Sequence, residues 1–547
     1  MKLVSVPEML SIEREADASG LTYEIMMENA GLGLADAVRE ACADLPERSA
    51  LGLVGSGNNG GDTLVALTSL VESGWTATAL LVRPRKDGDE LVERLRQAGG
   101  EVLQVGEAWL EDAGQLSELL GTHAVLLDGI LGTGFELPLK PALAQTLAAV
   151  RDMLREMDTP PRVIAVDCPS GVDADSGQAA DECIPADLTV TMAAVKRGLL
   201  RFPAFQLLGD LKVVGIGNLD GIKAWEALRS FVVDHAYIRS VLPSRPLDAH
   251  KGTFGTALVV AGSTNYTGAA LLAGQAAYRC GAGLVTMAVP GPLHQALAGH
   301  FPEATWILLP HDLGVIAREA VEVLRDQMER ATALLLGPGF GLEDTTREFI
   351  SLLVSATEST GHGGRIGFDY PAHTGRPAVA KAGKTLPPLV IDADGLKLLA
   401  RIPGWACLLP VETILTPHPG ELSIMTGTSK DAIQADRLAI AQRLAQEWGH
   451  ILVLKGALTV VAAPDGQLAV IPVASPALAR AGTGDVLAGL IVGLRAQGVP
   501  AFEAAAAGAW LHAQAGLCAA RRLGSTATVL AGDVLGSVRE VMATLSD

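Results

Sequence analysis

The chain has 547 residues, too many for one hydrophobic core, so its length predicts two to four domains. Hydrophobic residues make up 49% of the chain and 61 residues are glycine, a composition that fits compact α/β domains rather than disorder. The net charge of −19, with no run of lysine or arginine, argues against a nucleic-acid partner. Because the sequence has no apolar leader and no stretch of about 18 apolar residues, we expect a cytoplasmic protein without a membrane partner.

Short apolar runs recur between helical stretches in the first 220 residues. Near-continuous β-branched runs of this length are typical of strands that are buried on both faces of a parallel sheet. The sequence therefore predicts an N-terminal three-layer α/β/α domain, Rossmann-like in outline, that opens with helical segments around 11–15 and 26–31. The expected strands are residues 51–54, 78–82, 125–127, 163–166, 188–192 and 211–214.

A glycine-rich loop, residues 55–62, follows the first of these strands and precedes a helix. Its glycines permit close approach of the backbone to an anion at the helix N-terminus, although tight packing alone would also explain them. The pair Asn58 and Asn59 and the carboxylate of Asp62 add oxygen ligands that suit a monovalent or divalent cation, or a substrate amide.

Two further strand ends carry polar residues. Residues 127–138 place a second glycine-rich loop after Asp128, and residues 166–173 offer Asp167 and Ser170. Each aspartate by itself could be a helix cap or turn former. Because the carboxyl ends of strands in one open sheet converge on a crevice, together they favour a polar ligand site.

These N-terminal motifs resemble those of the NAD(P)H-hydrate epimerase domain (YjeF N-terminal type), with expected limits of 1–222. The resemblance implies that hydrated NADH or NADPH binds in this domain, that Asp167 is catalytic, and that a potassium ion is held near Asn59, Asp128 and Ser170. Thr63 stands where the family usually has glycine, and residues 195–198 replace a more usual Lys-Pro-Gly. The implied substrate-binding residues are Asn58, Asn59, Gly60, Gly61, Asp62, Gly132, Thr133, Gly134, Phe135, Glu136, Leu137, Pro138 and Asp167.

A polar segment, residues 218–249, is expected to be the linker to a second strand and helix series. This series also predicts a three-layer α/β domain, and it closes with helices that begin near Val486 and Ala501. Residues 361–384, rich in Gly, Pro, His and Lys, are expected to be a surface insertion or a lid. The expected strands are residues 256–260, 284–289, 333–336, 389–391, 413–415, 451–454 and 458–461.

The most informative motif of the chain, residues 479–487, joins a glycine-rich turn to an apolar helix. Gly482 and Gly484 let several N–H groups approach one anion, and the helix N-terminus adds a positive dipole end. A phosphate would repel Asp485 unless that carboxylate works on a proton, for example of a hydroxyl that attacks a phosphoryl group. The alternative is an aspartate that merely caps the helix.

Two further strand ends of this half carry basic side chains. Lys455, beside Gly456 and Thr459, suits the phosphates of a nucleotide, although a single strand-end lysine is usually just solvated. His418 stands between two prolines, which present it rigidly, and it could equally be a structural turn histidine.

Taken in order, the motifs of the second half resemble those of the NAD(P)H-hydrate dehydratase domain, a member of the ribokinase-like superfamily, with expected limits of 228–543. Ser475 stands where the family usually has asparagine, and Arg480 is atypical beside its neighbours. The resemblance implies that Asp485 is catalytic. It also implies that Ala270, Gly339, His418 and Asp485 contact the hydrated nucleotide, and that Lys455, Gly456, Ala457, Leu458, Thr459 and Gly484 hold ADP.

The two resemblances together imply a bifunctional repair enzyme for NADH or NADPH that has gained water at C6. The first domain would epimerise the R and S forms, and the second would dehydrate the S form with ADP and Mg²⁺, giving NAD(P)H, AMP and phosphate. ATP remains open as the donor, and a homo-oligomer is expected. The alternatives are a ribokinase-like small-molecule kinase and an N-terminal half that only senses nucleotides or binds protein.

Overall fold

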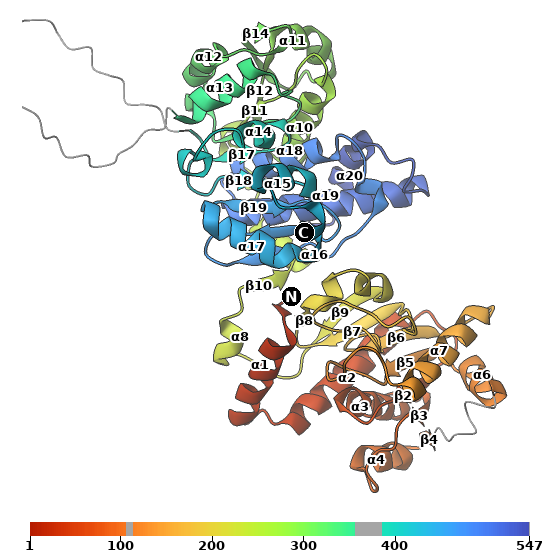
Figure 1. Ribbon diagram of the computed structural model, residues 1–547. Coiled ribbons are helices and arrows are strands. Elements are labelled where there is room, and N and C mark those ends of the chain that lie inside the picture. The colour runs from red at the N-terminus through yellow and green to blue at the C-terminus, as the bar shows by residue number, and fades with distance from the viewer. Residues whose placement is uncertain (105–112, 356–385, 546–547) are drawn as a thin grey trace, which may run out of the picture. The chain divides into compact units, whose positions relative to one another are not determined.

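The computed structural model describes residues 1–104, 113–355 and 386–545. Its contacts divide it into two compact units, Met1–Val232 and Val233–Asp547. Each unit is an α/β structure around a mainly parallel sheet, as expected (Figure 1). The proposed insertion at 361–384 lies outside the described residues. Within the described residues, no helix is long and apolar enough to cross a bilayer.

The first unit is built on a seven-stranded parallel sheet in the order β4-β3-β2-β5-β6-β7-β9. The strands of the unit, of which β1, β8 and β10 lie outside this sheet, are β1 (Leu3–Val4), β2 (Ser49–Val54), β3 (Thr76–Leu81), β4 (Glu101–Gln104), β5 (Val125–Gly129), β6 (Arg162–Val166), β7 (Leu188–Met192), β8 (Val195–Lys196), β9 (Asp210–Val214) and β10 (Ser230–Val232). Its helices are α1 (Val6–Ala18), α2 (Tyr23–Ala41), α3 (Asn58–Glu72), α4 (Glu90–Ala98), α6 (Ala113–Thr122), α7 (Pro141–Glu156) and α8 (Lys223–Glu226).

Both faces of this sheet are buried, which makes the unit three-layered. Ala50 and Val54 of β2 belong to a core shared with α1 to α4, whereas Leu51 and Leu53 belong to a second core shared with α6 and α7. The alternation follows from the two-residue repeat of a strand. From β2 the chain first runs outward to β3 and β4 and then continues on the other side with β5. The carboxyl ends of β2 and β5 therefore form the switch point at which open α/β sheets bind ligands.

The second unit has the strand order β21-β20-β19-β18-β17-β16-β11-β12-β13, parallel except for β20 and β21. Unbroken burial of β16 and β19 indicates cover on both faces. Its strands are β11 (Thr256–Val260), β12 (Leu284–Pro290), β13 (Thr305–Leu309), β14 (His311–Asp312), β15 (Val315–Ile316), β16 (Ala333–Leu336), β17 (Leu389–Ile391), β18 (Ile414–Leu415), β19 (Ile451–Leu454), β20 (Val460–Ala462) and β21 (Leu468–Val470). Its helices are α9 (His235–Val241), α10 (Thr267–Arg279), α11 (Gly291–Leu297), α12 (Ala320–Gln327), α13 (Asp344–Ser355), α14 (Asp394–Leu399), α15 (Pro419–Thr426), α16 (Lys430–Ala435), α17 (Arg437–Trp448), α18 (Thr483–Ala496), α19 (Ala501–Leu523) and α20 (Ala531–Ala543).

The expected linker, residues 218–249, is more ordered than its polar composition predicts. It contains α8, β10 and α9, and it buries Val232, Val233 and Ile238 completely. These three buried apolar side chains anchor the segment in the hydrophobic core, which a count of its polar residues does not reveal.

Candidate functional site

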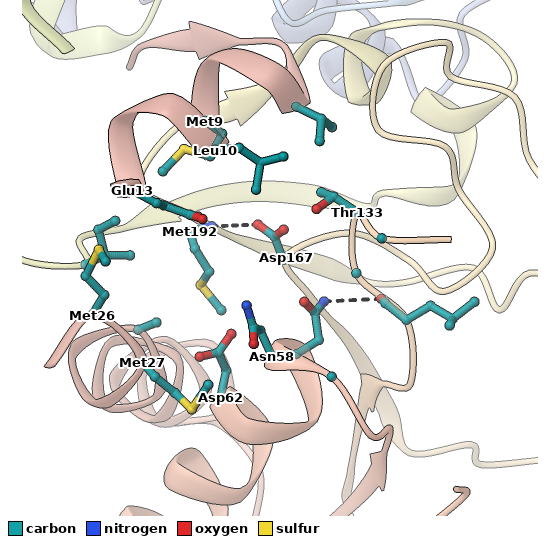
Figure 2. A pocket seen from close by; sticks show the side chains of 18 of the residues that line it. Met9, Leu10, Glu13, Met26, Met27, Asn58, Asp62, Thr133, Asp167 and Met192 are labelled. Carbon is teal, nitrogen blue, oxygen red and sulfur yellow. Dashed lines mark hydrogen bonds between the residues drawn. The ribbon is translucent and has the colours of Figure 1, made fainter. Parts of the chain in front are cut away.

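A cavity of about 520 Å³ lies in the first unit, where residues that follow β2, β5 and β6 meet α1, α2 and α3 (Figure 2). One side is apolar and includes Met9, Met26 and Met27, whereas carboxylate and amide side chains project from the other elements. Seven of the predicted substrate-binding residues line this cavity: Asn58, Asn59, Asp62, Gly132, Thr133, Gly134 and Asp167. The other six do not line it: Gly60 and Gly61 are buried within α3, and Phe135, Glu136, Leu137 and Pro138 follow the second glycine-rich loop.

The glycine-rich loop closes on the rest of the sheet so tightly that side chains would not fit. A Cβ at Gly60 would lie 2.0 Å from the carbonyl oxygen of Gly55. Arg85 supports the turn from outside by donating to that same carbonyl at 2.7 Å and by pairing with Asp89 at 2.8 Å. Close packing is therefore an observed property of this loop, while its residues 56–58 stay exposed.

A buried oxygen-rich network joins three strand ends beside the cavity. Ser170 donates from Oγ to Oδ1 of Asp128 at 2.5 Å and from its backbone N–H to Oδ2 at 2.8 Å. Asn59 donates to the carbonyl oxygens of Val166 at 2.5 Å and Leu131 at 3.2 Å. The structure thus brings together Asn59, Asp128 and Ser170, the three residues that sequence analysis linked to potassium.

Asp128 lacks a cationic partner in this network. Within the described residues no lysine, arginine or histidine forms an ion pair with it, and its side chain is 1% exposed. Burial raises the pKa of the Asp128 carboxyl, and the bonds from Ser170 oppose this rise. A buried carboxylate beside amide, hydroxyl and carbonyl oxygens fits a hard cation, which would supply the missing positive charge.

Asp167 is the most firmly held carboxylate of the cavity. Its Oδ1 accepts hydrogen bonds from the hydroxyl of Thr191 at 3.0 Å, from the backbone N–H of Met192 at 2.9 Å and from the Lys196 ammonium. Lys196 is itself 2% exposed and donates to the carbonyl of Met192 at 2.9 Å. The backbone of Asp167 has a φ of 66°, a conformation that non-glycine residues rarely adopt and that recurs at functional sites.

Two other carboxyl groups reach the same cavity, Glu13 from α1 and Asp62 from α3, and they point into it from different sides (Figure 2). Burial raises the pKa of Asp62 well above its usual range, and the field of Asp167 adds to the rise. Burial also raises the pKa of Glu13, with Lys196 acting against it. Burial of this kind favours the protonated form of a carboxyl group, so both side chains are candidates for proton transfer.

The second unit gathers its charged residues at three neighbouring strand ends. Asp392 follows β17, Thr416 follows β18 and Lys455 follows β19. Lys455 Nζ lies 2.5 Å from Asp392 Oδ1 and 3.6 Å from Glu421 Oε2, and Thr416 donates to Asp392 at 2.7 Å. Lys455 is therefore a partly buried member of a charge cluster, with its side chain 14% exposed, and not the solvated strand-end lysine that its sequence context also allowed.

Asp485 lies in the first turn of α18, after Gly482 with a φ of 88°. A Cβ at Gly484 would lie 3.5 Å from Lys455 Nζ, so this turn faces the charge cluster. Burial, followed by the field of Asp392, raises the pKa of Asp485 to about 7, against the lowering effect of Lys455. A carboxylate with this pKa is well matched to general-base catalysis near neutral pH.

The predicted nucleotide loop, Lys455 to Thr459, contains two residues with positive φ: Gly456 at 140° and Leu458 at 55°. The loop is held by Thr459, which donates to the Gly456 carbonyl at 2.8 Å, and by Arg437, which donates to the carbonyl of Leu454 at 2.8 Å. Lys455 and Gly484 are close together, and Gly456, Ala457, Leu458 and Thr459 continue the chain away from them.

The three remaining residues predicted to contact the hydrated nucleotide, His418, Gly339 and Ala270, differ in how far they are exposed. His418 caps α15 by accepting from the N–H groups of Gly420 at 2.9 Å and Glu421 at 3.2 Å, while half of its side chain stays exposed. The structural turn role that the sequence left open is thus present. Gly339 has a φ of 66°. Ala270 is fully buried, so its side chain presents no surface to a ligand.

Sequence reasoning assigned no role to four charged residues that the structure places at these sites: Glu13, Lys196, Asp392 and Glu421. Lys196 lies in the stretch noted only as a departure from the family pattern. Asp392 directly follows the expected strand 389–391, and a charged residue at the end of an apolar strand was a signal that could have found it.

Two family models match the chain. One is described as "NAD(P)H-hydrate dehydratase" and matches residues 257–362 and 366–536; the other is described as "YjeF-related protein N-terminus" and matches residues 23–198.

Curated relatives match over almost the whole chain. A "Bifunctional NAD(P)H-hydrate repair enzyme Nnr" of Moorella thermoacetica is 36% identical, with 100% of this chain and 98% of the relative covered. The protein of the same description from Escherichia coli is 31% identical, with 97% and 92% covered. Among solved structures, an ADP/ATP-dependent NAD(P)H-hydrate dehydratase from Bacillus subtilis is 29% identical, covers 58% of this chain and 98% of its own, and has a TM-score of 0.46.

Proposed function

The chain belongs to the family of bifunctional NAD(P)H-hydrate repair enzymes, and from this membership we propose how its two units divide the work. It is an enzyme with an epimerase domain and a dehydratase domain. Its substrates are hydrated NADH or NADPH, in which C6 of the nicotinamide ring carries a hydroxyl group. The alternative of a small-molecule kinase with a nucleotide-sensing N-terminal domain is not favoured, because the relatives share both domains over the full length.

The position of Asp485 carries the assignment of the dehydratase centre. Its pKa of about 7 lets it take the proton from the C6 hydroxyl, whose oxygen then attacks the terminal phosphorus of ADP as AMP departs. Phosphate next leaves with the C6–O electron pair and C5 loses a proton, which restores the C5–C6 double bond. The purpose of the phosphoryl transfer is to replace hydroxide, a poor leaving group, by phosphate.

Lys455 and the N-terminus of α18 supply the positive charge that this step requires. Lys455 is held 2.5 Å from Asp392 and faces Gly484, and backbone N–H groups at the start of a helix stabilise anions. We propose that the loop from Lys455 to Thr459 together with Gly484 binds the nucleotide. Gly339 and His418 stay proposed contacts of the hydrated nicotinamide, whereas Ala270, which the resemblance also implied, is fully buried and would support the site from behind.

Mg²⁺ would enter this site with the nucleotide. Among the described residues no group of three or more His, Cys, Asp or Glu side chains could hold a metal ion, and Mg²⁺ is commonly bound through substrate phosphates and few carboxylates. When bound, the ion neutralises charge on the transferred phosphoryl group. Asp392 and Glu421, the buried carboxylates nearest to Lys455, are the side chains that could reach it.

In the epimerase centre we propose that Asp167 contacts the nicotinamide and that Asn58, Asn59 and Asp62, with Gly132 to Gly134, surround the substrate. Residues 60, 61 and 135–138 would then shape the two loops. Asn59, Asp128 and Ser170 would hold potassium, which fits because the buried Asp128 carboxylate has no ion pair within the described residues. The cation would supply charge balance and fix the loop from Ile130 to Gly134 against α3.

Three further proposals concern the domain limits, the location and the oligomeric state of the protein. The domain limits of 1–222 and 228–543 fit the two family matches and the two compact units. A cytoplasmic location is supported by six cysteines that are all free thiols, as expected in a reducing compartment. A homo-oligomer is supported by large apolar side chains that are strongly exposed, among them Leu313 and Val411.

The function is tested by following absorbance at 340 nm while the protein, ADP, Mg²⁺ and K⁺ act on both epimers of hydrated NADH. Wild type should recover all of the NADH. Asp485→Asn should lose dehydration by a factor of about 10² to 10⁴, the contribution of a general base. Asp431→Asn, at an exposed aspartate of the same unit, is the matched control and should match wild type.

The outcomes separate the two activities. Recovery that stops when one epimer is consumed would remove the epimerase assignment. Full activity of Asp485→Asn would remove the role of that carboxylate, and recovery with ATP but not ADP would replace the phosphoryl donor.

A further inference from the structure

The epimerase cavity contains more carboxyl groups than the binding of one substrate requires. Asp167, Asp62 and Glu13 come from three different parts of the unit and reach one space of about 520 Å³, together with Lys196 (Figure 2). The three carboxyl groups have different surroundings, and this difference indicates different roles.

Asp167 is suited to carrying a fixed negative charge. Three donors, including the Lys196 ammonium, share its Oδ1. These donors and the ion pair with Lys196 fix the position of the carboxylate. It is therefore well placed to stabilise a cation on the substrate and poorly suited to donating a proton.

Glu13 and Asp62 differ from Asp167 in having no such donors. Within the described residues neither side chain forms a hydrogen bond or an ion pair. Asp62 is 6% exposed, and because the charge of Glu13 acts on its carboxyl, ionisation of one group favours a proton on the other. Figure 2 shows Glu13 above the cavity on α1 and Asp62 below it on α3.

We propose that Glu13 is a catalytic residue of the epimerase, the proton donor and acceptor at the C6 oxygen on one face of the nicotinamide ring, with Asp62 facing it from the other side. This inference rests on the proposed function of the first unit. It moves proton transfer away from Asp167, to which sequence analysis assigned it, and leaves Asp167 as the anion that stabilises the ring cation.

Epimerisation begins with loss of the hydroxyl group from C6. Glu13 gives its proton to the C6 hydroxyl, the C6–O bond breaks with both electrons leaving on water, and the N1 lone pair forms the N1–C6 double bond. Water then attacks C6 from the opposite face, the double-bond electrons return to N1, and Asp62 accepts the proton of the attacking water. This direction starts with Glu13 protonated and Asp62 ionised, and the reverse direction starts with Asp62 protonated and Glu13 ionised. Proton exchange with solvent restores both carboxyl groups, so nothing is consumed.

The charged groups that face Glu13 determine its pH behaviour. Burial raises the pKa of its carboxyl, Lys196 on β8 lowers it, and Asp167 after β6 raises it. Asp62 on α3 belongs to the same set, because its own pKa responds to Glu13. Since the donor must be protonated, epimerase kcat/KM should fall as pH rises through the pKa of Glu13.

The test is the rate of interconversion of the separated epimers, measured by chromatography and corrected for the rate without protein. Glu13→Gln should lower it by a factor of about 10² or more, the usual contribution of a general acid. Glu13→Asp should keep partial activity with a displaced pH profile, and formate should restore activity to Glu13→Ala. Dehydration of the pure S epimer is the internal control and should be unchanged in all three variants.

Glu15→Gln, at an exposed position of the same helix, is the matched control and should epimerise like wild type. The inference is overturned if Glu13→Gln epimerises within about threefold of wild type. It is also overturned if Glu13→Asp is as inactive as Glu13→Gln and formate restores nothing, because a purely structural role gives that pattern. Absence of epimerisation in wild type would instead overturn the proposed function.

Discussion

Lys455 Nζ lies 2.5 Å from Asp392 Oδ1 and so joins the ends of β19 and β17, although the two residues are 63 positions apart in the chain. Asp392 is 1% exposed, and Thr416, at the end of the strand between them, donates to the same oxygen. The pair lies beside Gly484, and after burial Asp392 has the largest effect on the pKa of Asp485. The ion pair between Lys455 and Asp392, which sequence patterns do not specify, therefore influences the pKa of the proposed catalytic base Asp485.

Asp392→Asn should move the pH dependence of dehydration to lower pH. Removal of this negative charge, and the less neutralised Lys455 that remains, both favour the ionised form of Asp485. Because the base acts in its ionised form, dehydratase kcat/KM should rise through a pH of about 7 in wild type and at a lower pH in the variant. A series of kcat/KM values from pH 5 to 9 would measure the displacement.

The same variant should also be less stable, by about 1.5–3 kcal/mol, because it loses a hydrogen bond between charged groups and leaves Glu421, at 3.6 Å, as the ion-pair partner of Lys455. Asp394→Asn is the matched comparison: Asp394 pairs with Lys397 at 2.9 Å and raises the pKa of Asp485 less than Asp392 does. It should shift the pH profile in the same direction by a smaller amount. An unmoved profile in Asp392→Asn would contradict the electrostatic account.

Potassium should stabilise the first unit and support its activity through Asp128. A ligand that binds only the folded state stabilises it by about 2.7 kcal/mol at 100 times its dissociation constant. Thermal unfolding in potassium and in choline salts should show this difference for wild type, and epimerisation should be slower in choline. Dehydration of the S epimer reports on general effects of salt.

Asp128→Asn is the variant for this experiment, because it removes the buried charge and keeps a similar shape. Its unfolding temperature should be the same in both salts. Equal responses of Asp128→Asn and wild type to potassium would place the cation elsewhere.

Most strands of both sheets could be predicted from the sequence, because a buried parallel strand leaves a continuous apolar run. The predicted ranges 256–260, 333–336, 389–391 and 451–454 coincide with β11, β16, β17 and β19. The strands β4 and β13 were missed: each lies at an edge of its sheet and is partly exposed. Exposure on one side interrupts the apolar run with polar residues such as Glu101 and Gln104.

The two site aspartates, Asp167 and Asp485, could be found because each lies in a short local motif next to glycines or a helix start. Glu13 and Lys196 could not, since they reach the cavity from α1 and β8, and only the packing of those elements on the sheet brings them there. Convergence of distant residues is a property of the tertiary fold.

Gly60→Ala should damage the first unit, whereas Gly57→Ala should not. A Cβ at Gly60 would lie 2.0 Å from the carbonyl oxygen and 2.8 Å from the carbonyl carbon of Gly55, and because these are backbone atoms we expect a loss of about 1–3 kcal/mol. Gly57 has no atom within 4 Å of its ideal Cβ and a φ of −97°, which alanine adopts freely. Urea unfolding of both variants measures the difference, and equal stability would show that the loop relaxes.

Arg83→Gln should weaken binding of hydrated NADPH more than binding of hydrated NADH. Arg83 follows β3, the neighbour of β2, and lines the cavity without an ion pair or hydrogen bond within the described residues. In dinucleotide-binding sheets an arginine near this position accommodates the ribose 2′-phosphate. Loss of a hydrogen bond to a charged group costs about 1.5–3 kcal/mol, so epimerase KM for hydrated NADPH should rise by a factor of about 10 or more.

With hydrated NADH, which lacks that phosphate, KM should change by less than about threefold. Lys86→Gln, at an exposed position three residues further on, should leave both values as in wild type. If the two substrates lose affinity equally, Arg83 contacts the pyrophosphate that they share. If neither changes, the guanidinium does not reach the bound nucleotide, and the dinucleotide must enter the cavity with its adenosine away from the end of β3.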